Sequence, residues 1–101
     1  MDEQERVAEF VATHDVDAPP VYRLLDLLSE VGELAKDANE STDYGSDPGA
    51  VELSEDELGD ALFALLALCD RAGVDSGDAL ETALAKYERR LSESDTPGSG
   101  E

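Results

Sequence analysis

Cysteine, tryptophan and lysine are scarce in this sequence. Among its 101 residues there is one cysteine, no tryptophan and only two lysines. A single cysteine cannot form an internal disulfide and argues against a thiolate metal site. No apolar run approaches the roughly 20 residues of a membrane span, and the acidic N-terminus lacks the basic start of a signal peptide. We therefore expect a cytoplasmic protein that makes no membrane contact.

Positively charged residues are also few. Asp and Glu number 26 against 7 Lys and Arg, which gives a formal net charge of −19. Nucleic acid would be repelled, because its binding requires positive groups that neutralise phosphates, and we expect no nucleic-acid partner. The hydrophobic fraction of 41% predicts a folded protein. Such acidity favours a halophilic source, where salt screens the repulsion between surface charges.

Strand-like alternation is absent, and helical periodicity takes its place. Apolar residues at spacings of three and four predict helices over residues 2–14, 20–39, 55–73 and, with Ser76 or Asp78 as the cap, up to residue 91. The longest connection, residues 40–51, joins the second and third helices. The fold class predicted is all-α, a four-helix antiparallel bundle unit over residues 1–91. Residues 92–101 have nothing to bury and are predicted to be a mobile acidic tail.

Two of the expected helices contain the same short pattern. Segment 30–34, EVGEL, and segment 57–61, ELGDA, both read acid, aliphatic, Gly, acid, apolar. In each helix the two acids lie one turn apart at the edge of an apolar stripe. If the two helices pack as a hairpin, four carboxylates come together. The candidates are Glu30, Glu33, Glu57 and Asp60.

Four carboxylates on rigid helices would form a site of hard oxygen ligands. Such ligands suit Mg²⁺, Mn²⁺ or Ca²⁺ rather than zinc or copper. The alternative is a solvated acidic face, which arises easily in a chain that is one-quarter acidic, and the duplication leaves the two readings about equal. Gly32 and Gly59 lie between the acids, where glycine costs about 1 kcal/mol relative to alanine. For these glycines we favour close approach of a backbone or ligand over chance.

A second candidate feature is basic. Lys86, Arg89 and Arg90 supply three of the seven cations within five residues, and Lys86 and Arg90 share a helix face. Cations near a helix C-terminus can simply offset the helix dipole. We favour the reading in which Lys86 and Arg90 receive the phosphates of a ligand that is also held by Mg²⁺.

Three strings carry a family resemblance. They are LLDLLSEVGELAKDANE, ELGDALFALLALCDRAGVD and ALETALAKYERR, and together they resemble the MazG-like all-α nucleoside triphosphate pyrophosphohydrolases across about residues 5–91. The family pattern is ExxE on one helix, ExxD on the next, and then a Lys and an Arg, all of which are present. One departure is Ser29, which stands where many members have a second Glu.

The resemblance implies an enzyme that cleaves a nucleoside triphosphate between its α and β phosphates, giving a monophosphate and pyrophosphate. It implies that Mg²⁺, with Mn²⁺ also possible, is bound by the catalytic residues and that two cations hold phosphate. It also implies a homodimer or homotetramer, which agrees with the small core that 101 residues can build. The catalytic and metal residues implied are Glu30, Glu33, Glu57 and Asp60, and the phosphate-binding residues are Lys86 and Arg90.

Two rival functions stay open from the sequence. Hydrolysis of phosphoribosyl-ATP would use the same fold and ligand layout. A non-catalytic helical protein that only self-assembles would use the apolar stripes and leave the acid pairs as salt-adapted surface. Turnover of a nucleotide panel, and a melting temperature that rises with Mg²⁺ beyond the effect of ionic strength, separate these readings.

Overall fold

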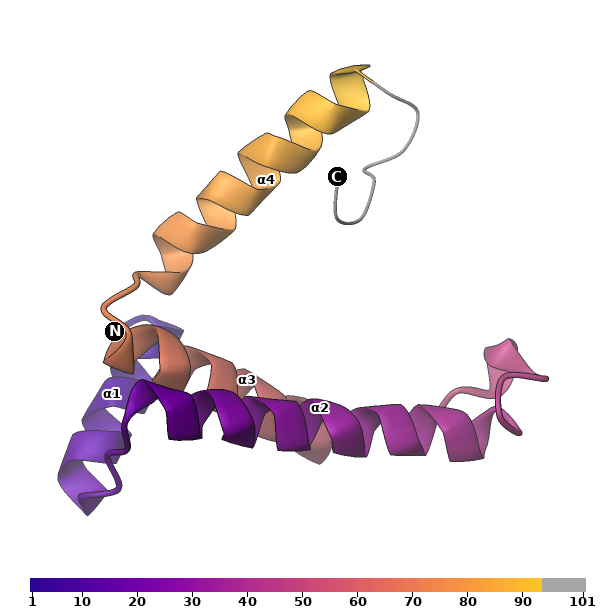
Figure 1. Cartoon of the computed structure of the whole chain (residues 1–101), viewed down its shortest axis with the longest axis horizontal. Helices are drawn as coiled ribbons and strands as arrows, with labels where there is room; N and C mark the ends of the chain where they lie inside the picture. The colour runs from indigo at the N-terminus through magenta and orange to yellow at the C-terminus, as the bar shows by residue number, and fades with distance from the viewer. Residues whose placement is uncertain (94–101) are drawn as a thin grey trace.

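The computed structural model describes residues 1–93, and these are almost entirely helical (Figure 1). The elements are α1 (Glu3–His14), α2 (Pro20–Ser41), the short 3₁₀ helix η1 (Pro48–Ala50), α3 (Glu55–Arg71) and α4 (Ser76–Glu93). No strand occurs within residues 1–93, so the predicted all-α class with four α-helices is confirmed. None of the described helices has both the length and the apolarity needed to cross a membrane. Residues 94–101 of the predicted tail lie outside the described residues.

The helix ends follow local side-chain signals. At α1 the Asp2 carboxylate accepts a hydrogen bond from the backbone N–H of Glu5 (2.8 Å), and the Glu5 carboxylate accepts one from the N–H of Asp2 (3.1 Å). This reciprocal pair is a capping box. At α3 the Ser54 hydroxyl accepts from the N–H of Glu57 (3.0 Å). Gly73 follows α3 with φ at +73°, the left-handed conformation of a C′ glycine, as predicted.

The cap of α4 differs from the prediction by one residue. The carboxylate of Asp75 accepts a hydrogen bond from the backbone N–H of Asp78 (2.8 Å), and α4 begins at Ser76. Asp75 therefore caps the helix, and the expectation that Ser76 or Asp78 does so was wrong. The segment DSGD contains three side chains that are good caps, so residue type alone did not identify which one is used.

Helix α3 is the centre of the packing. It contacts α1, α2 and α4, and it carries three of the buried apolar side chains, Ala64, Leu66 and Ala67. Val11 of α1 is the other buried apolar residue among those described. Helix α2 lies along α3 as an antiparallel hairpin, joined by the segment that contains η1 (Figure 1). Small side chains on α3 let neighbouring helices approach closely, which brings the α2 and α3 acids near one another.

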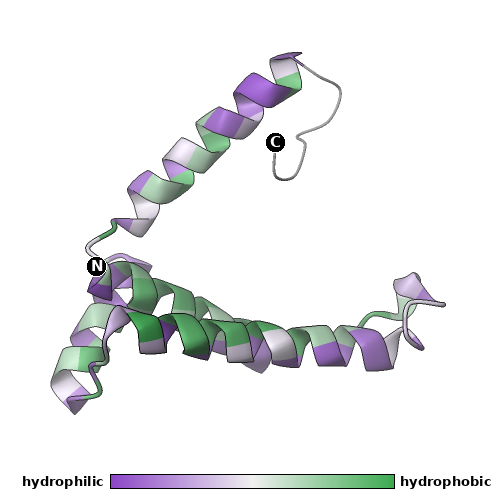
Figure 2. Ribbon diagram, in the orientation of Figure 1, coloured by the Kyte–Doolittle hydropathy of each residue, from purple (hydrophilic) through white to green (hydrophobic). Residues whose placement is uncertain are grey.

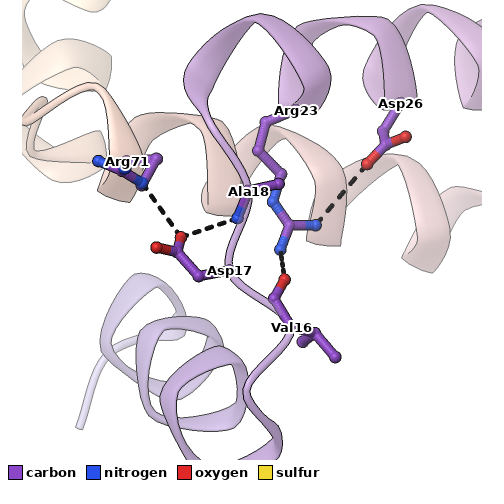
Figure 3. A network of polar contacts seen from close by, with 6 residues as sticks. All are labelled: Val16, Asp17, Ala18, Arg23, Asp26 and Arg71. Carbon is purple, nitrogen blue, oxygen red and sulfur yellow. Dashed lines mark hydrogen bonds and ion pairs between the residues drawn. The ribbon is translucent and has the colours of Figure 1, made fainter.

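A polar network joins the α1–α2 connection to the hairpin (Figure 3). The buried guanidinium of Arg23 donates a hydrogen bond to the backbone carbonyl of Val16 and lies 3.7 Å from the carboxylate of Asp26. An exposed ion pair of 3.1 Å links Arg71, at the end of α3, to Asp17. The connection between α1 and α2 is therefore fixed to both helices of the hairpin.

Helix α4 leaves the end of α3 and points away from the hairpin (Figure 1). The turn before it is held by one side chain of α1. The amide nitrogen of Gln4 donates to the carbonyl of Val74 (2.8 Å), and the amide oxygen of Gln4 accepts from the N–H of Ser76 (2.6 Å). Beyond this turn α4 makes few contacts with the other helices.

Large apolar side chains of α2 and α4 remain exposed, and Figure 2 colours the apolar residues along both ribbons green. On α4 they recur at spacings of four, three and four, and on α2 at three, four and three, so each set lies on one face. Exposed apolar faces of this extent indicate an interaction surface. The two stripes are Leu80, Leu84, Tyr87 and Leu91 on α4, and Val21, Leu24, Leu28 and Val31 on α2.

The Arg23 contact predicts a measurable stability difference. Replacing Arg23 with Met removes a largely buried hydrogen bond to the Val16 carbonyl, and we expect the free energy of unfolding to fall by about 1–3 kcal/mol. Arg71→Met breaks only the exposed ion pair with Asp17 and should cost no more than about 1 kcal/mol. Urea denaturation of both variants at one protein concentration checks the order. An equal or larger loss for Arg71→Met would contradict it.

Candidate functional site

The two repeated acid turns face each other across the α2–α3 hairpin. Glu30 of α2 and Asp60 of α3 line the same cleft, whose volume is about 290 Å³. One turn further along, Glu33 and Glu57 lie close enough for their charges to interact. The four acids predicted from the sequence therefore form two pairs, one member of each pair on each helix.

Glu57 is the acid most affected by its surroundings. Its side chain is half-buried, and one oxygen, Oε2, is fully covered and has no hydrogen-bond partner among the described residues. A hydrogen bond to the carboxylate of Asp37 raises the pKa of Glu57, and partial burial raises it further. The negative charges of Asp37, Glu33 and Asp56 act in the same direction. The site is thus short of positive charge where Glu57 lies.

Asp37 is a member of this group that the sequence reasoning missed. It lies on α2, where Glu30, Glu33 and Asp37 follow at spacings of three and four. That spacing places all three on one helix face and was available from the sequence. Asp37 was overlooked because it falls outside the repeated five-residue pattern.

The donor set fits a hard divalent cation in its chemistry. The groups that face one another are carboxylates, and the covered oxygen of Glu57 has no hydrogen-bond partner among the described residues. Within residues 1–93, however, no three Asp, Glu, His or Cys side chains are placed so that they could hold one metal ion together. Side-chain rotation at the two pairs would be needed to enclose a cation, while the helices supply the backbone framework.

Gly32 and Gly59, the glycines of the repeated pattern, have no neighbouring backbone packed against them within the subunit. A Cβ atom built on Gly32 or Gly59 would meet no atom within 4 Å among the residues described. Close approach of a neighbouring backbone is therefore not found within the subunit, and close approach of a ligand stays a prediction. Both positions border open space on the faces of α2 and α3.

The predicted phosphate-binding cations lie on a different part of the structure. Lys86 and Arg90 belong to α4, which points away from the hairpin that carries the acids (Figure 1). Both lie near the ring of Tyr87, with the Lys86 Nζ atom 5.1 Å and the Arg90 Cζ atom 6.0 Å from its centroid. A single subunit in this conformation does not bring these cations to the carboxylates.

The comparison with protein families bears directly on this arrangement. The family model described as the MazG nucleotide pyrophosphohydrolase domain matches residues 22–93, a range that includes most of α2 and all of α3 and α4. The chain belongs to the MazG nucleotide pyrophosphohydrolase family. Neither the comparison with curated proteins nor that with solved structures finds a match. The MazG family is generally dependent on divalent metal ions, and the paired acids lie within the matched range.

The raised pKa of Glu57 predicts how stability changes with pH. Between the ordinary pKa of a glutamate and the raised one, the folded protein binds more protons than the unfolded chain, so the free energy of unfolding falls as pH rises. Glu57→Gln removes this titration. Without metal, we expect the variant to be at least as stable as the natural protein, with an advantage that grows through that pH range and then levels off.

Thermal unfolding in EDTA across acidic to neutral pH measures this difference. Glu9→Gln, which removes the same charge from the exposed face of α1, is the matched control and should show no such trend. A Glu57→Gln variant that is less stable than the natural protein at neutral pH would show that the ionised carboxylate is favourable in the fold.

Proposed function

We propose that this MazG-family protein hydrolyses a nucleoside triphosphate between the α and β phosphates, releasing a monophosphate and pyrophosphate. Mg²⁺ would be held by Glu30, Glu33, Glu57 and Asp60. The observation that carries the proposal is the facing of the two acid turns across the hairpin, with a covered and unpaired oxygen at Glu57. The pKa of Glu57 is raised by its hydrogen bond with Asp37, by partial burial and by the negative charges around it, and a bound cation would offset those charges.

In this proposal the protein's own side chains position the phosphate and accept a proton. When bound, the divalent ion supplies neutralisation of the triphosphate charge and a lower pKa for water. The two helices fix the carboxylates on rigid backbone, so that the reacting phosphate is positioned between them. The reaction consumes one water and breaks a bond from phosphorus to the oxygen that bridges the α and β phosphates. One of the four carboxylates, Glu30, Glu33, Glu57 or Asp60, accepts the proton of that water.

The cations of α4 would come from a second copy of the chain. The apolar stripes of α4 and α2 are exposed in one subunit, and a partner that covers them would complete the small core. Arg90 lies at one edge of the α4 stripe and Lys86 lies one helical turn before it on the same side, so a partner that packs against α4 lies beside that edge, with Arg90 the nearer of the two cations. We therefore assign them to the phosphates bound on the carboxylates of the other subunit, in a homodimer or in a homotetramer built from such pairs.

Turnover of a nucleotide panel tests the proposed reaction. Ribo- and deoxyribonucleoside triphosphates and phosphoribosyl-ATP are incubated with Mg²⁺ at high salt, and pyrophosphate release is measured. We expect release from at least one nucleoside triphosphate and none with Glu57→Gln, while Glu9→Gln keeps its activity. Mg²⁺ should also raise the melting temperature above that at matched ionic strength, and less so for Glu57→Gln.

Two outcomes count against the reaction. Pyrophosphate release from none of the panel leaves a non-catalytic helical assembly, and full activity of Glu57→Gln removes the metal assignment. Release from phosphoribosyl-ATP alone would move the substrate to the rival pyrophosphohydrolase reaction on the same site.

The assembly is tested by a single charge on the α4 stripe. Leu84→Glu buries a carboxylate in the proposed interface and should convert the oligomer to a monomer, as measured by light scattering during gel filtration. Thr82→Glu adds the same charge to the opposite face of α4 and should leave the oligomer intact. An unchanged mass for Leu84→Glu would place the interface elsewhere.

Mixed subunits test the origin of the cations. Glu57→Gln and Arg90→Ala subunits are each expected to lack turnover. After unfolding and refolding together, they should recover part of it, because a mixed dimer then contains one site with intact carboxylates and an intact Arg90. No recovery would mean that carboxylates and cations of the same subunit work together.

A further inference from the structure

The row of carboxylates between α2 and α3 has a cleft at each end, and the two clefts differ in chemistry. One, of about 290 Å³, is lined by Arg23, Asp26 and Phe63 together with the pair Glu30 and Asp60. The other, of about 710 Å³, contains the acids Asp37, Glu40 and Glu52 and no aromatic ring or cation among its described lining residues. A triphosphate on the carboxylate row would extend its nucleoside into one of these two clefts.

The cleft beside Arg23 suits a nucleoside better. Phe63 supplies an aromatic ring there, and bases stack on such rings whatever their identity. The ring is held edge-on against Phe10, with 5.9 Å between centroids and 88° between planes. The volume lies just below the roughly 300–1,000 Å³ of drug-sized ligand sites, so the cleft has room for a base with part of its sugar. A hollow of about 380 Å³ between α1 and α3 also borders Phe63, but none of the four paired acids lines it.

Arg23 and Asp26 both line this cleft, and Figure 3 shows the guanidinium of Arg23 directed at the carboxylate of Asp26. The Arg23 side chain is only 10% exposed and directs its donors to the carbonyl of Val16 and to Asp26. The Asp26 side chain is 59% exposed and lines the cleft. The guanidinium thus orients a carboxylate that remains accessible from the cleft. An ionised carboxylate can only accept hydrogen bonds.

We propose that Asp26 selects nucleotides whose base carries an amino group, such as cytosine or adenine, over uracil and thymine. An amino group donates a hydrogen bond to the carboxylate, whereas the carbonyl that replaces it in uracil would place two acceptors against each other. This inference rests on the proposed function, because the position of the triphosphate fixes which cleft receives the base. Asp26 is a specificity-determining residue in this reading and takes no part in the hydrolysis.

The comparison of CTP with UTP tests the proposal, because the two nucleotides differ in this group and in the adjacent ring nitrogen. For the natural protein we expect kcat/KM to favour CTP by about tenfold or more. Asp26→Asn should reduce that ratio by about tenfold, because an amide can also donate to the carbonyl of uracil. Asp70→Asn removes the same charge about 15 Å further along α3 from Asp60 and should leave the ratio unchanged. Melting temperatures of both variants confirm that they are folded.

Equilibrium binding supplies a readout that does not depend on hydrolysis. Titration calorimetry with CMP and UMP in the absence of Mg²⁺ should show tighter binding of CMP by the natural protein and loss of that preference in Asp26→Asn. If no nucleotide is hydrolysed but this preference is found, the proposed reaction fails and the role of Asp26 stands. If nucleotides are hydrolysed and Asp26→Asn keeps the ratio of the natural protein, only the role of Asp26 fails. Absence of a cytidine preference in both assays also overturns it.

Discussion

The packing of α2 against the small-residue face of α3 is the contact on which the rest of the structure depends. Ala64 is buried there and borders the same cleft as Glu30 and Asp60. Larger side chains at such a position would hold the helices apart and separate the acids of the two turns. The contact therefore both supplies core and brings like charges together, and the pKa of Glu57 is raised by its hydrogen bond with Asp37, by partial burial and by those charges. The same packing of α2 on α3 therefore contributes to the stability of the fold and places the acids of the candidate site.

Much of this arrangement could be predicted from local sequence patterns. Helical periodicity, the cap at Ser54 and the C′ role of Gly73 depend on neighbours within a few residues, and the structure reproduces them. To predict that the acid turns of α2 and α3 face each other, it was enough to assume that the apolar stripes of these helices pack as a hairpin. Asp37 could also have been found, because it shares a helix face with Glu30 and Glu33.

Other features depend on contacts that periodicity does not encode. Arg23 reads as one more charge in an amphipathic helix, yet its side chain is buried because the α1–α2 connection folds back over it and presents the carbonyl of Val16. Gly32 and Gly59 were expected to admit a neighbouring backbone or a ligand, and within the subunit no backbone approaches either of them. The direction of α4 follows from the turn before it and not from its own sequence, so the separation of Lys86 from the acids could not be anticipated.

The side chain of Gln4 links the first turn of α1 to the start of α4. Its amide binds both the carbonyl of Val74 and the N–H of Ser76, on either side of the turn from which α4 departs. These two hydrogen bonds hold the turn at the base of α4, an 18-residue helix whose C-terminal half carries Lys86 and Arg90. A small rotation at this turn would produce a larger displacement of those cations, because they lie far along α4. A side chain near the N-terminus thereby restrains the base of a helix whose cations are distant from it in sequence.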